Sequence, residues 1–263
     1  MGNFVTLNSL KPAFKLAMRI PRFYIDQPLQ LDNELSLPQE VHRHAIQVLR
    51  LAVDDVLILF NGKGGEYRAI LTNAQKRHSR VRIISFDAIN RDSPLKISLA
   101  IAMIKADKMD FAIQKAVEMG VNCIQPLYTE RSVIKLKANR LGKKLSHWKG
   151  VIKAACEQSG RTAIPQILAP MPLMLWLASS TASTSLHLAM LPKKHSHITT
   201  LKPPENEKMT LIVGPEGGFT DQEVDLLLSS NRVEAIQFGP RILRAETAVI
   251  AGIAICQQQW GDL

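Results

Sequence analysis

Two short loops in the C-terminal half of the sequence constrain its fold more than any other feature. Each loop follows an apolar run, stops at Gly-Pro and leads into a helix-like stretch; they occupy Leu211–Thr220 and Phe238–Thr247. Loops that follow adjacent strands of a parallel sheet form one ligand crevice at the carboxyl ends of those strands. We therefore expect the two loops to lie side by side and to bind a small molecule, which favours a cofactor site in an α/β domain.

The length and composition are those of a soluble globular protein. The chain has 263 residues, 46% hydrophobic and 21% charged, enough for one large or two modest domains. Its longest apolar run, Ala248–Cys256, is too short to cross a bilayer, and its first residues lack the apolar stretch of a secretory signal. We therefore expect a cytoplasmic location and no membrane partner.

Cysteine usage gives no indication of a crosslinked or metal-bound fold. The three cysteines, Cys123, Cys156 and Cys256, are far apart, and neither a CxxC nor an HxxxH pair occurs. A disulfide framework or a structural zinc site would need clustered cysteines or histidines. The sequence therefore predicts neither, and no metal.

Positive charge is concentrated in one stretch, residues 131–161, called here the basic segment. The chain carries a net charge of +10, and this segment alone holds nine lysines or arginines against the single acid Glu157. The segment is therefore +8 and the rest of the chain only +2. Such a basic stripe suits a polyanion such as nucleic acid, whereas the alternative is a solvated, lysine-rich helix face.

The N-terminal third reads as a loose extension followed by a small β-rich domain. Residues 1–17 have weak periodicity, and residues 18–92 contain short β-like runs. A Gly-rich connection at 61–66 is typical of a hairpin. The predicted strands are Val56–Phe60, Tyr67–Leu71 and Val81–Phe86, and one helix is predicted over Glu40–Arg50.

From residue 93 onward, β-like and helix-like stretches alternate. The continuous apolar run Ile97–Ile104 is typical of a strand buried on both faces. Apolar residues recur at helical spacing from Met109 to Val117, and Gly120 is a typical helix stop. Alternation of this kind predicts a mostly parallel sheet covered by helices. Further strands are predicted at 123–128, 185–191, 209–213 and 234–238, and helices at 139–159, 171–179, 220–230 and 245–259.

The first Gly-Pro loop, Gly214–Gly218, matches neither a Walker loop nor a GxGxxG motif. Its glycines permit close approach to a ligand, but Glu216 would repel a phosphate. A carboxylate here suits a ligand that presents cationic groups or hydroxyls, such as S-adenosylmethionine. An ordinary glycine-rich turn before a helix, which Thr220 and Glu223 would open with a capping box, is the alternative.

The second loop mixes charged and apolar residues in a way that is unusual for a simple turn. Ile242 and Leu243 could form the wall of an adenine site. Alternatively, Glu246 and Thr247 belong to a salt-bridged helix start with Arg241 and Arg244.

Two further charged positions are candidates for chemistry. Arg161 follows Gly160 at a predicted helix end, where it could bind phosphate or stabilise an anion, or only complement the helix dipole. Glu130 and Arg131 follow a predicted strand end, where parallel sheets carry active sites, although such charges are often only solvated.

In their order along the chain, these segments resemble the bacterial 16S ribosomal RNA uracil-N3 methyltransferases, a branch of the SPOUT class. The resemblance extends from about residue 18 to the C-terminus, and its specificity comes from the ordered set rather than from any one run. The matching runs are 19–23, 44–50, 60–62, 107–115, 118–121, 126–127, 130–132, 154–161, 213–219 and 239–247.

The resemblance implies a two-domain fold preceded by the extension at 1–17. Residues 18–92 would form a PUA-like β-barrel that helps to hold RNA, and residues 93–263 an α/β SPOUT domain with a mostly parallel sheet and a C-terminal trefoil knot. SPOUT enzymes are homodimers with the cofactor in the knot. Two departures occur: Met190–Pro192 replaces a common Leu-His-Pro, and Ala245 replaces a frequent Thr.

The resemblance also implies roles for residues at matching positions. The catalytic candidates are Arg161, Glu157, Glu130 and Arg131. The S-adenosylmethionine site would comprise Met190, Leu191, Pro192, Gly214, Pro215, Glu216, Gly217, Gly218, Phe238, Gly239, Ile242, Leu243, Arg244, Ala245 and Thr247. Arg19, Arg22, Arg50, Lys105, Lys135 and Lys137 would contact RNA.

The implied reaction is methyl transfer to N3 of a specific uridine in 16S rRNA within the 30S subunit, without a metal. N3 carries an imide proton, so the enzyme must help to remove it and stabilise the resulting charge. Alternatives are a methyltransferase with another RNA target, or a non-catalytic RNA-binding assembly factor with a vestigial cofactor pocket. A nucleotide-binding enzyme is disfavoured, because the P-loop lysine is missing.

Overall fold

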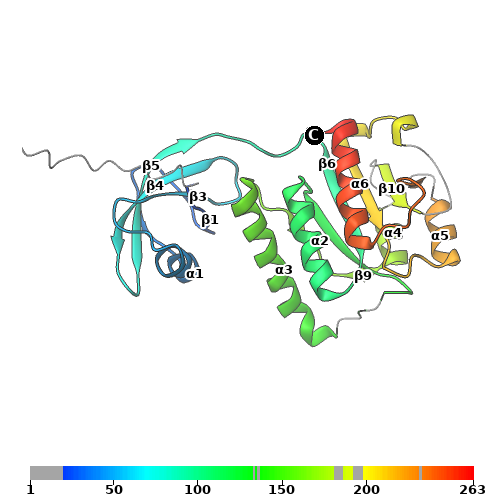
Figure 1. The fold of residues 1–263 in the computed structure, drawn as a ribbon, viewed down its shortest axis with the longest axis horizontal. Helices are drawn as coiled ribbons and strands as arrows, with labels where there is room; N and C mark the ends of the chain where they lie inside the picture. Colours follow the sequence, from blue (N-terminus) through cyan, green and yellow to red (C-terminus); the bar gives the residue numbers. More distant parts are fainter. Residues whose placement is uncertain (1–19, 133, 135–136, 181–185, 192–197, 231–232) are drawn as a thin grey trace, which may run out of the picture.

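The protein folds into two sheets, each with its own core, as seen in the computed structural model (Figure 1). The structure describes residues 20–132, 134, 137–180, 186–191, 198–230 and 233–263. The predicted extension at 1–17 and three predicted site residues, Arg19, Lys135 and Pro192, lie outside these ranges.

The N-terminal sheet has five strands in the order β1-β3-β4-β5-β2. β1 pairs with β3 in parallel, and the other neighbours are antiparallel. The three predicted strands correspond to β3, β4 and β5, and the predicted hairpin connects β3 to β4. The edge strands β1 and β2 were not predicted, because three residues are too few to show the alternating pattern of a strand. The bounds are β1 Arg22–Tyr24, β2 Glu34–Ser36, β3 Val56–Phe60, β4 Glu66–Ala74 and β5 Ser79–Asp87.

The predicted N-terminal helix is present but changes its winding. It begins as α1, Gln39–His42, and continues as the π-helix η1, Arg43–Val48. Val41 and Ala45 are buried against the five-stranded sheet, in a core with Phe23, Leu57 and Ile83. This half is therefore a β-rich unit with one helical segment, as the sequence predicts.

The C-terminal sheet is parallel, with the order β12-β10-β11-β6-β7-β8 and β9 paired to β7. The prediction of a mostly parallel sheet is confirmed. β8 and β9 are only two residues long, too short to be predicted from a residue pattern. The bounds are β6 Lys96–Ala102, β7 Cys123–Tyr128, β8 Gln166–Ile167, β9 Met171–Pro172, β10 Leu186–Met190, β11 Lys208–Val213 and β12 Val233–Ile236.

Helices cover both faces of the parallel sheet, and alternate residues of each strand contact opposite layers. Leu99 and Ile101 of β6 pack in the core that includes α2, α3 and α6, whereas Ala100 packs with α4 and α5. Burial on both faces explains the continuous apolar run of β6. The helices are α2 Ala106–Glu118, α3 Ala138–Ser159, α4 Leu173–Ser180, α5 Asp221–Leu228 and α6 Ala245–Trp260.

The connection from β10 to β11 carries two single turns of 3-10 helix, η2 Ile198–Thr200 and η3 Glu205–Glu207. In a trefoil knot, the chain passes through a loop formed by another part of the chain. The predicted knot in this half stays a prediction. Within the described ranges, no helix combines the length and the apolarity that crossing a membrane requires.

A buried polar joint connects the two sheets. Arg22 of β1 and Arg91 both form ion pairs with Glu66, at 3.0 and 3.1 Å between nitrogen and oxygen. Arg22 also donates to the carbonyls of Cys156 and Arg161, each at 3.4 Å, and its guanidinium lies over the Phe60 ring. The nearly buried side chain of Arg22 therefore holds the sheets together, and its role in RNA binding stays a prediction.

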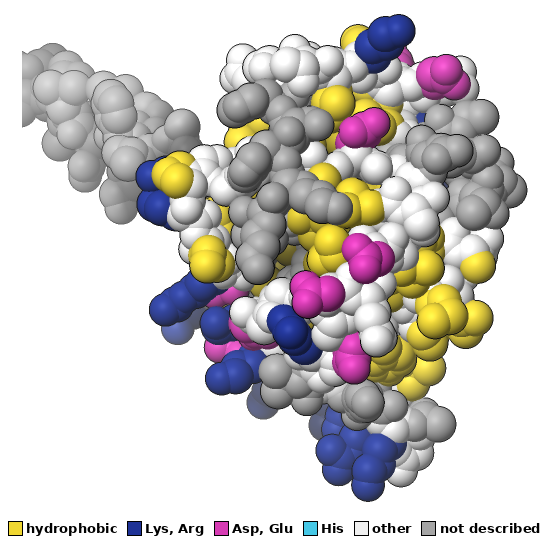
Figure 2. Space-filling view, turned by 90° about the vertical axis from the view of Figure 1, so that its right-hand side faces the viewer, with side chains coloured by type: hydrophobic (Ala, Val, Ile, Leu, Met, Phe, Trp, Pro, Cys, Tyr) yellow, Lys and Arg dark blue, Asp and Glu magenta, His cyan; other side chains and the backbone are white. Residues whose placement is uncertain are grey.

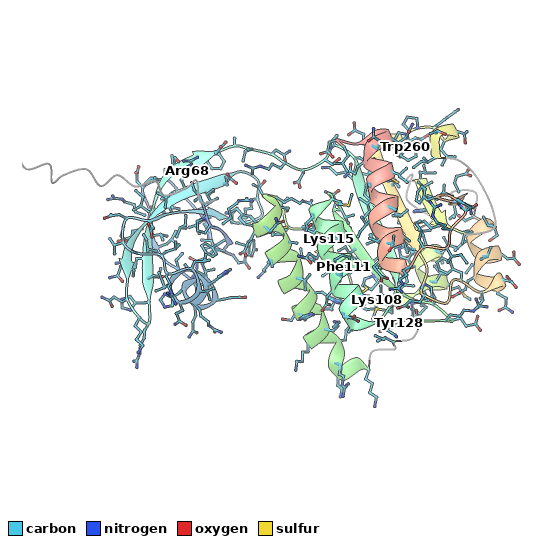
Figure 3. All side chains as sticks on the ribbon, in the orientation of Figure 1. Arg68, Lys108, Phe111, Lys115, Tyr128 and Trp260 are labelled. Atoms are coloured by element: carbon cyan, nitrogen blue, oxygen red, sulfur yellow. The ribbon has the colours of Figure 1, made fainter. Side chains whose placement is uncertain are left out.

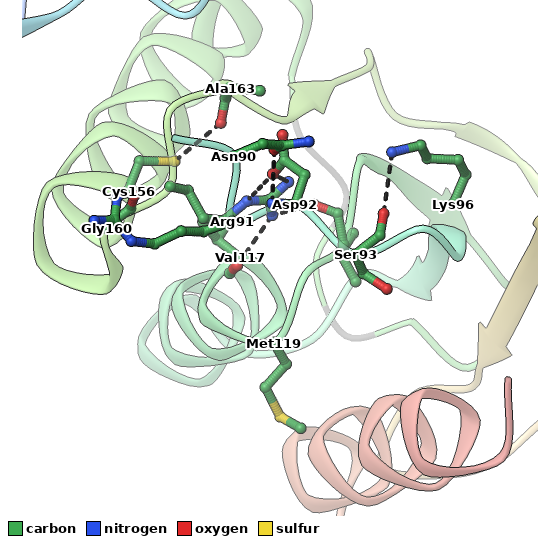
Figure 4. A network of polar contacts seen from close by, with 12 residues as sticks. Asn90, Arg91, Asp92, Ser93, Lys96, Val117, Met119, Cys156, Gly160 and Ala163 are labelled. Carbon is green, nitrogen blue, oxygen red and sulfur yellow. Dashed lines mark hydrogen bonds and ion pairs between the residues drawn. The ribbon is translucent and has the colours of Figure 1, made fainter. Parts of the chain in front are cut away.

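The joint continues into the loop before β6 (Figure 4). Arg91 donates to the carbonyl of Gly160 at 3.0 Å, and the Oγ of Ser93 donates to Oε1 of Gln257 at 2.8 Å. The backbone N–H of Tyr24 donates to the carboxylate of Glu157 on α3 at 2.9 Å. Figure 1 shows the consequence, with α3 lying between the five-stranded sheet and α2.

Replacing Glu66 by Gln tests the joint. The variant leaves Arg22 without its buried counter-charge, so the free energy of unfolding should fall by about 3–5 kcal/mol. Glu34→Gln is the control, because the Glu34–Arg80 pair is exposed and worth only about 0–1 kcal/mol. Urea unfolding followed by circular dichroism measures both, and equal losses in the two variants would contradict the assigned role.

Candidate cofactor pocket and its surroundings

A pocket lies where three loops leave the carboxyl ends of β10, β11 and β12. It encloses about 700 Å³ of space, with the open solvent at its mouth included. Its walls are mainly apolar. The lining residues are Met190, Leu191, Val213, Gly214, Pro215, Glu216, Gly218, Phe219, Ile236, Gln237, Phe238, Arg241, Ile242, Leu243, Ala245 and Ala248.

The two Gly-Pro loops therefore lie side by side, as the sequence predicts. Ten of the predicted cofactor residues line the pocket, from Met190 and Leu191 through the Gly214 loop to Ala245. Gly217, Gly239, Arg244 and Thr247 lie on the same loops but outside the lining. Their expected roles in cofactor binding stay predictions.

Tight turns hold the loop after β11 in place. The N–H of Gly218 donates to the carbonyl of Pro215 at 2.9 Å, and Gly218 has a φ of +68°, which favours glycine. A Cβ at Gly214 would lie 3.0–3.3 Å from ring atoms of Phe219. The predicted capping box is present, since Thr220 and Glu223 bond reciprocally at the start of α5.

Glu130 and Arg131 reach this loop from the end of β7. Nη1 of Arg131 donates to the carbonyls of Gly217 and Phe219 at 2.9 and 3.3 Å. The backbone N–H of Glu130 donates to the carboxylate of Glu223 at 2.8 Å. Both side chains are exposed, so the structure brings these two catalytic candidates to the edge of the sheet that carries the pocket.

The loop after β12 forms the opposite wall. Gly239 has a φ of +75°, Ile242 is 88% exposed, and Ala245 is buried where α6 begins. Just outside the wall, Glu246 forms an ion pair with Lys108 of α2 at 3.5 Å. Figure 3 shows Lys108 at the end of α2 where β7 ends at Tyr128, with Trp260 at the far end of α6. The amino ends of α2 and α6 thus border the pocket.

The sequence analysis missed several lining residues. Phe219 directly follows the glycines of the first loop, and Ala248 lies three residues after Ala245, on the same face of a helix. Both residues could therefore have been assigned to the pocket from their positions in the sequence. Val213, Ile236, Gln237 and Arg241 also line the pocket but were not assigned to it.

Arg161 does not lie at the pocket. Its guanidinium donates to Asp92 at 2.8 and 2.9 Å, and to the carbonyls of Val117 and Val121 at 3.0 and 2.6 Å. Val121 precedes β7, so Arg161 lies at the amino edge of the sheet, opposite the pocket, and is only 3% exposed. The cation after Gly160 thus turns inward and pairs with Asp92, away from the pocket of its own chain, and its catalytic role stays a prediction.

Glu157 is likewise engaged away from the pocket of its own chain. Its carboxylate accepts the backbone N–H of Tyr24 in the joint between the sheets. Burial raises the pKa of Glu157, although the bond from Tyr24 opposes this shift. Glu157 thus attaches β1 to α3, and its role as a possible base stays a prediction.

The remaining described RNA candidates are exposed. Lys105 and Lys137 precede α2 and α3, and Arg50 follows η1 with a φ of +55°. Their roles in RNA binding stay predictions.

Burial disfavours the thiolate form of two of the cysteines. Burial raises the pKa of Cys156 to about 12 and that of Cys256 to about 12. Among the described residues, His, Cys, Asp and Glu side chains form no group of three or more that could hold a metal ion.

Two protein-family models match the chain in order. A model described as an RNA methyltransferase PUA domain matches residues 37–84, and one described as an RNA methyltransferase domain matches residues 91–257. Since the second match alone covers more than half of the chain, the fold and the pocket are those of an RNA methyltransferase.

Similar proteins narrow this class. Ribosomal RNA small subunit methyltransferase E from Buchnera aphidicola is 34% identical, with 93% of this chain and 98% of the relative aligned. The protein of the same name from Bacillus subtilis is 30% identical, with 90% and 96% covered. The chain therefore belongs to the ribosomal RNA small subunit methyltransferase E family.

Solved structures agree with this assignment. The Neisseria gonorrhoeae ribosomal RNA small subunit methyltransferase E, bound to S-adenosyl methionine, matches with a TM-score of 0.85 and 34% identity, covering 93% of this chain and all of that one. A Legionella pneumophila protein with bound cofactor SAM matches with a TM-score of 0.88 and 37% identity, covering 94% and 100%.

Gly214→Ala tests the tightness of the pocket loop. The added Cβ pushes the Phe219 ring, which lines the pocket, so affinity for S-adenosylhomocysteine should fall about tenfold, or about 1.4 kcal/mol. Gly150→Ala is the control, because a Cβ there enters open space on α3. Calorimetry gives both dissociation constants; an unchanged value for Gly214→Ala would show that the loop adapts freely.

Proposed function

We propose that this chain transfers a methyl group from S-adenosylmethionine to N3 of a uridine in 16S rRNA. The observation that carries this proposal is the pocket between three loops at the carboxyl edge of the parallel sheet, in a chain of this family. When bound, the cofactor supplies an electrophilic methyl group on its sulfonium.

The residues of the pocket fit this cofactor. Apolar Leu191, Ile242 and Leu243 provide surface for a purine ring. Glu216 gives the lining a carboxylate, which suits the ammonium and ribose hydroxyls of S-adenosylmethionine and disfavours a nucleotide phosphate. Arg241 also lines the pocket, so the lining offers partners to both the ammonium and the carboxylate of the cofactor.

Glu130 is the catalytic candidate whose position suits proton removal. It lies exposed at the carboxyl edge, and its backbone is fixed by the bond to Glu223, so its carboxylate can approach a base held over the pocket. The carboxylate would accept the N3 proton of the uridine. Arg131 holds the pocket loop through Gly217 and Phe219, and its remaining guanidinium charge would face the anion that forms.

The chemistry of N3 also limits the substrate. N3 lies on the Watson–Crick edge, so the target uridine must be unpaired or flipped out. We propose the 30S subunit as the substrate particle, hence a cytoplasmic location. We further propose a homodimer and a knotted C-terminal half, as in the SPOUT class, with residues 18–92 and 93–263 as its two domains.

The direct test incubates the protein with labelled S-adenosylmethionine and either 30S particles or free 16S rRNA. We expect transfer to a single uridine, identified as N3-methyluridine by mass after nucleoside digestion, with 30S particles as the better substrate. Methylation of a different nucleoside would contradict the proposed chemistry. Cofactor binding without any transfer would instead favour a non-catalytic assembly factor.

Glu130→Gln tests the proposed base. The amide keeps the backbone bond to Glu223 but cannot accept the proton, so kcat should fall by about 100-fold or more. Affinity for S-adenosylhomocysteine should stay at the wild-type value. Glu234→Gln, which neutralises an exposed carboxylate on β12, is the matched control. Equal kcat values in the two variants would remove Glu130 from the mechanism.

A further inference from the structure

The cations of the basic segment differ in whether they contact the protein or are exposed to solvent. Arg161 is buried, Arg131 holds the pocket loop, and Lys153 lies over the ring of Tyr24, 4.8 Å from its centroid. These three contact the protein itself. Arg140 and Lys143, in the N-terminal half of α3, are instead exposed, so the positive charge available to a ligand is more localised than the sequence indicates.

Four of these residues line one open groove, called here the α3 groove. Arg140, Lys143, Lys144 and His147 all line it. They are spaced by three and four residues, which puts them on one face of the helix. Among the described residues, none that lines the groove is acidic. A surface of this charge favours an anionic ligand with several negative groups.

Asp110 of α2 holds part of the groove rigid. It accepts bonds from Nζ of Lys144 at 3.1 Å, from Nε2 of His147 at 2.6 Å and from Nε1 of Trp148 at 3.1 Å. Burial raises the pKa of Asp110, but the bonds from His147 and Lys144 outweigh it and leave the pKa lowered. Asp110 therefore stays ionised and fixes Lys144, whose Nζ also lies over the Trp148 ring. Arg140 and Lys143 remain as exposed cations beside this fixed pair.

The α3 groove lies at the same edge of the sheet as the cofactor pocket. α3 follows β7, so its first turns are at the carboxyl edge, where the pocket loops also begin. Figure 2 shows lysine and arginine side chains gathered at the lowest end of the molecule, which is the N-terminal end of α3 in Figure 1. Lys105 and Lys108, at the start of α2, lie between this end and the pocket wall at α6.

We propose that the α3 groove binds phosphates of the rRNA strand that flanks the target uridine, and that Lys105 and Lys108 continue this track toward the pocket. The inference rests on the proposed function for the identity of the RNA. The track is positively charged and leads to the pocket, so it can bind the RNA phosphates while one base of the RNA enters the pocket. An acidic protein partner on the same surface is the competing occupant, and the experiment separates the two.

The test uses the double variant Arg140→Ala, Lys143→Ala in the full-length protein. Both side chains are exposed and alanine favours helix, so the fold should be kept, which thermal unfolding by circular dichroism checks. The control is Lys202→Ala, Lys208→Ala, which removes the same charge from two exposed positions, the second at the start of β11 on the opposite edge.

Binding of a single-stranded 16S rRNA fragment is measured across a salt series. The α3 variant should bind about tenfold or more weakly than the control, and its slope of log K against log salt should be smaller by about 1.4, the value for two lost phosphate contacts on a single strand. The KM for RNA should rise, while affinity for S-adenosylhomocysteine should not change. An affinity and slope equal to those of the control would overturn the α3 groove as an RNA site.

The same experiment distinguishes failure of this inference from failure of the proposed function. If wild-type protein binds the RNA through the α3 groove but methylates no uridine, the proposed reaction fails and the groove stands. If wild-type protein methylates uridine and the α3 variant matches the control in RNA affinity and KM, the groove fails and the reaction stands.

Discussion

The parallel pairing of β10 with both β11 and β12 is the constraint on which the functional end of the molecule depends. In this register, His187 of β10 lies opposite Thr210 of β11 and Val233 of β12, so the three strands finish at one edge. Their loops then leave side by side and enclose the pocket. Antiparallel pairing at either side of β10 would have sent one of these loops to the opposite edge.

The same parallel order places the other candidate functional groups. β6 and β7 finish at this edge too, so α2 and α3 begin there. Glu130 and Arg131 follow β7, Lys105 and Lys108 belong to the start of α2, and the α3 groove occupies the first turns of α3. One edge of one sheet thus gathers the pocket, the catalytic candidates and the proposed RNA track.

The opposite edge is structural. There the joint between the sheets pairs the buried Arg22 with Glu66 and the buried Arg161 with Asp92, and the partly exposed Arg91 adds a second ion pair to Glu66. A buried ion needs such a partner, because removal from water costs several kcal/mol that only pairing and hydrogen bonds offset. This joint holds the five-stranded sheet against the C-terminal part of α3 and leaves its N-terminal part open to a ligand.

Patterns of neighbouring residues predicted most of the fold and the pocket. The features that were not predicted depend on contacts between residues far apart in the sequence. The apolar run of β6, the helical spacing from Met109 to Val117 and the capping box at Thr220 each depend on a few neighbouring residues. The inward orientation of the Arg161 side chain depends on Asp92 and on two carbonyls at or just after the end of α2, which are distant in sequence. A cation after a helix-ending glycine has the same sequence whether it points to solvent or inward, so its orientation needed the structure.

The position of the bound cofactor tests the central claim most directly. A crystal structure of the protein with S-adenosylhomocysteine should show the ligand between Gly214–Gly218 and Phe238–Ala245, with Glu216 near its ribose or ammonium group. A ligand bound anywhere else on the chain would contradict the claim that the parallel register of β10, β11 and β12 builds the site.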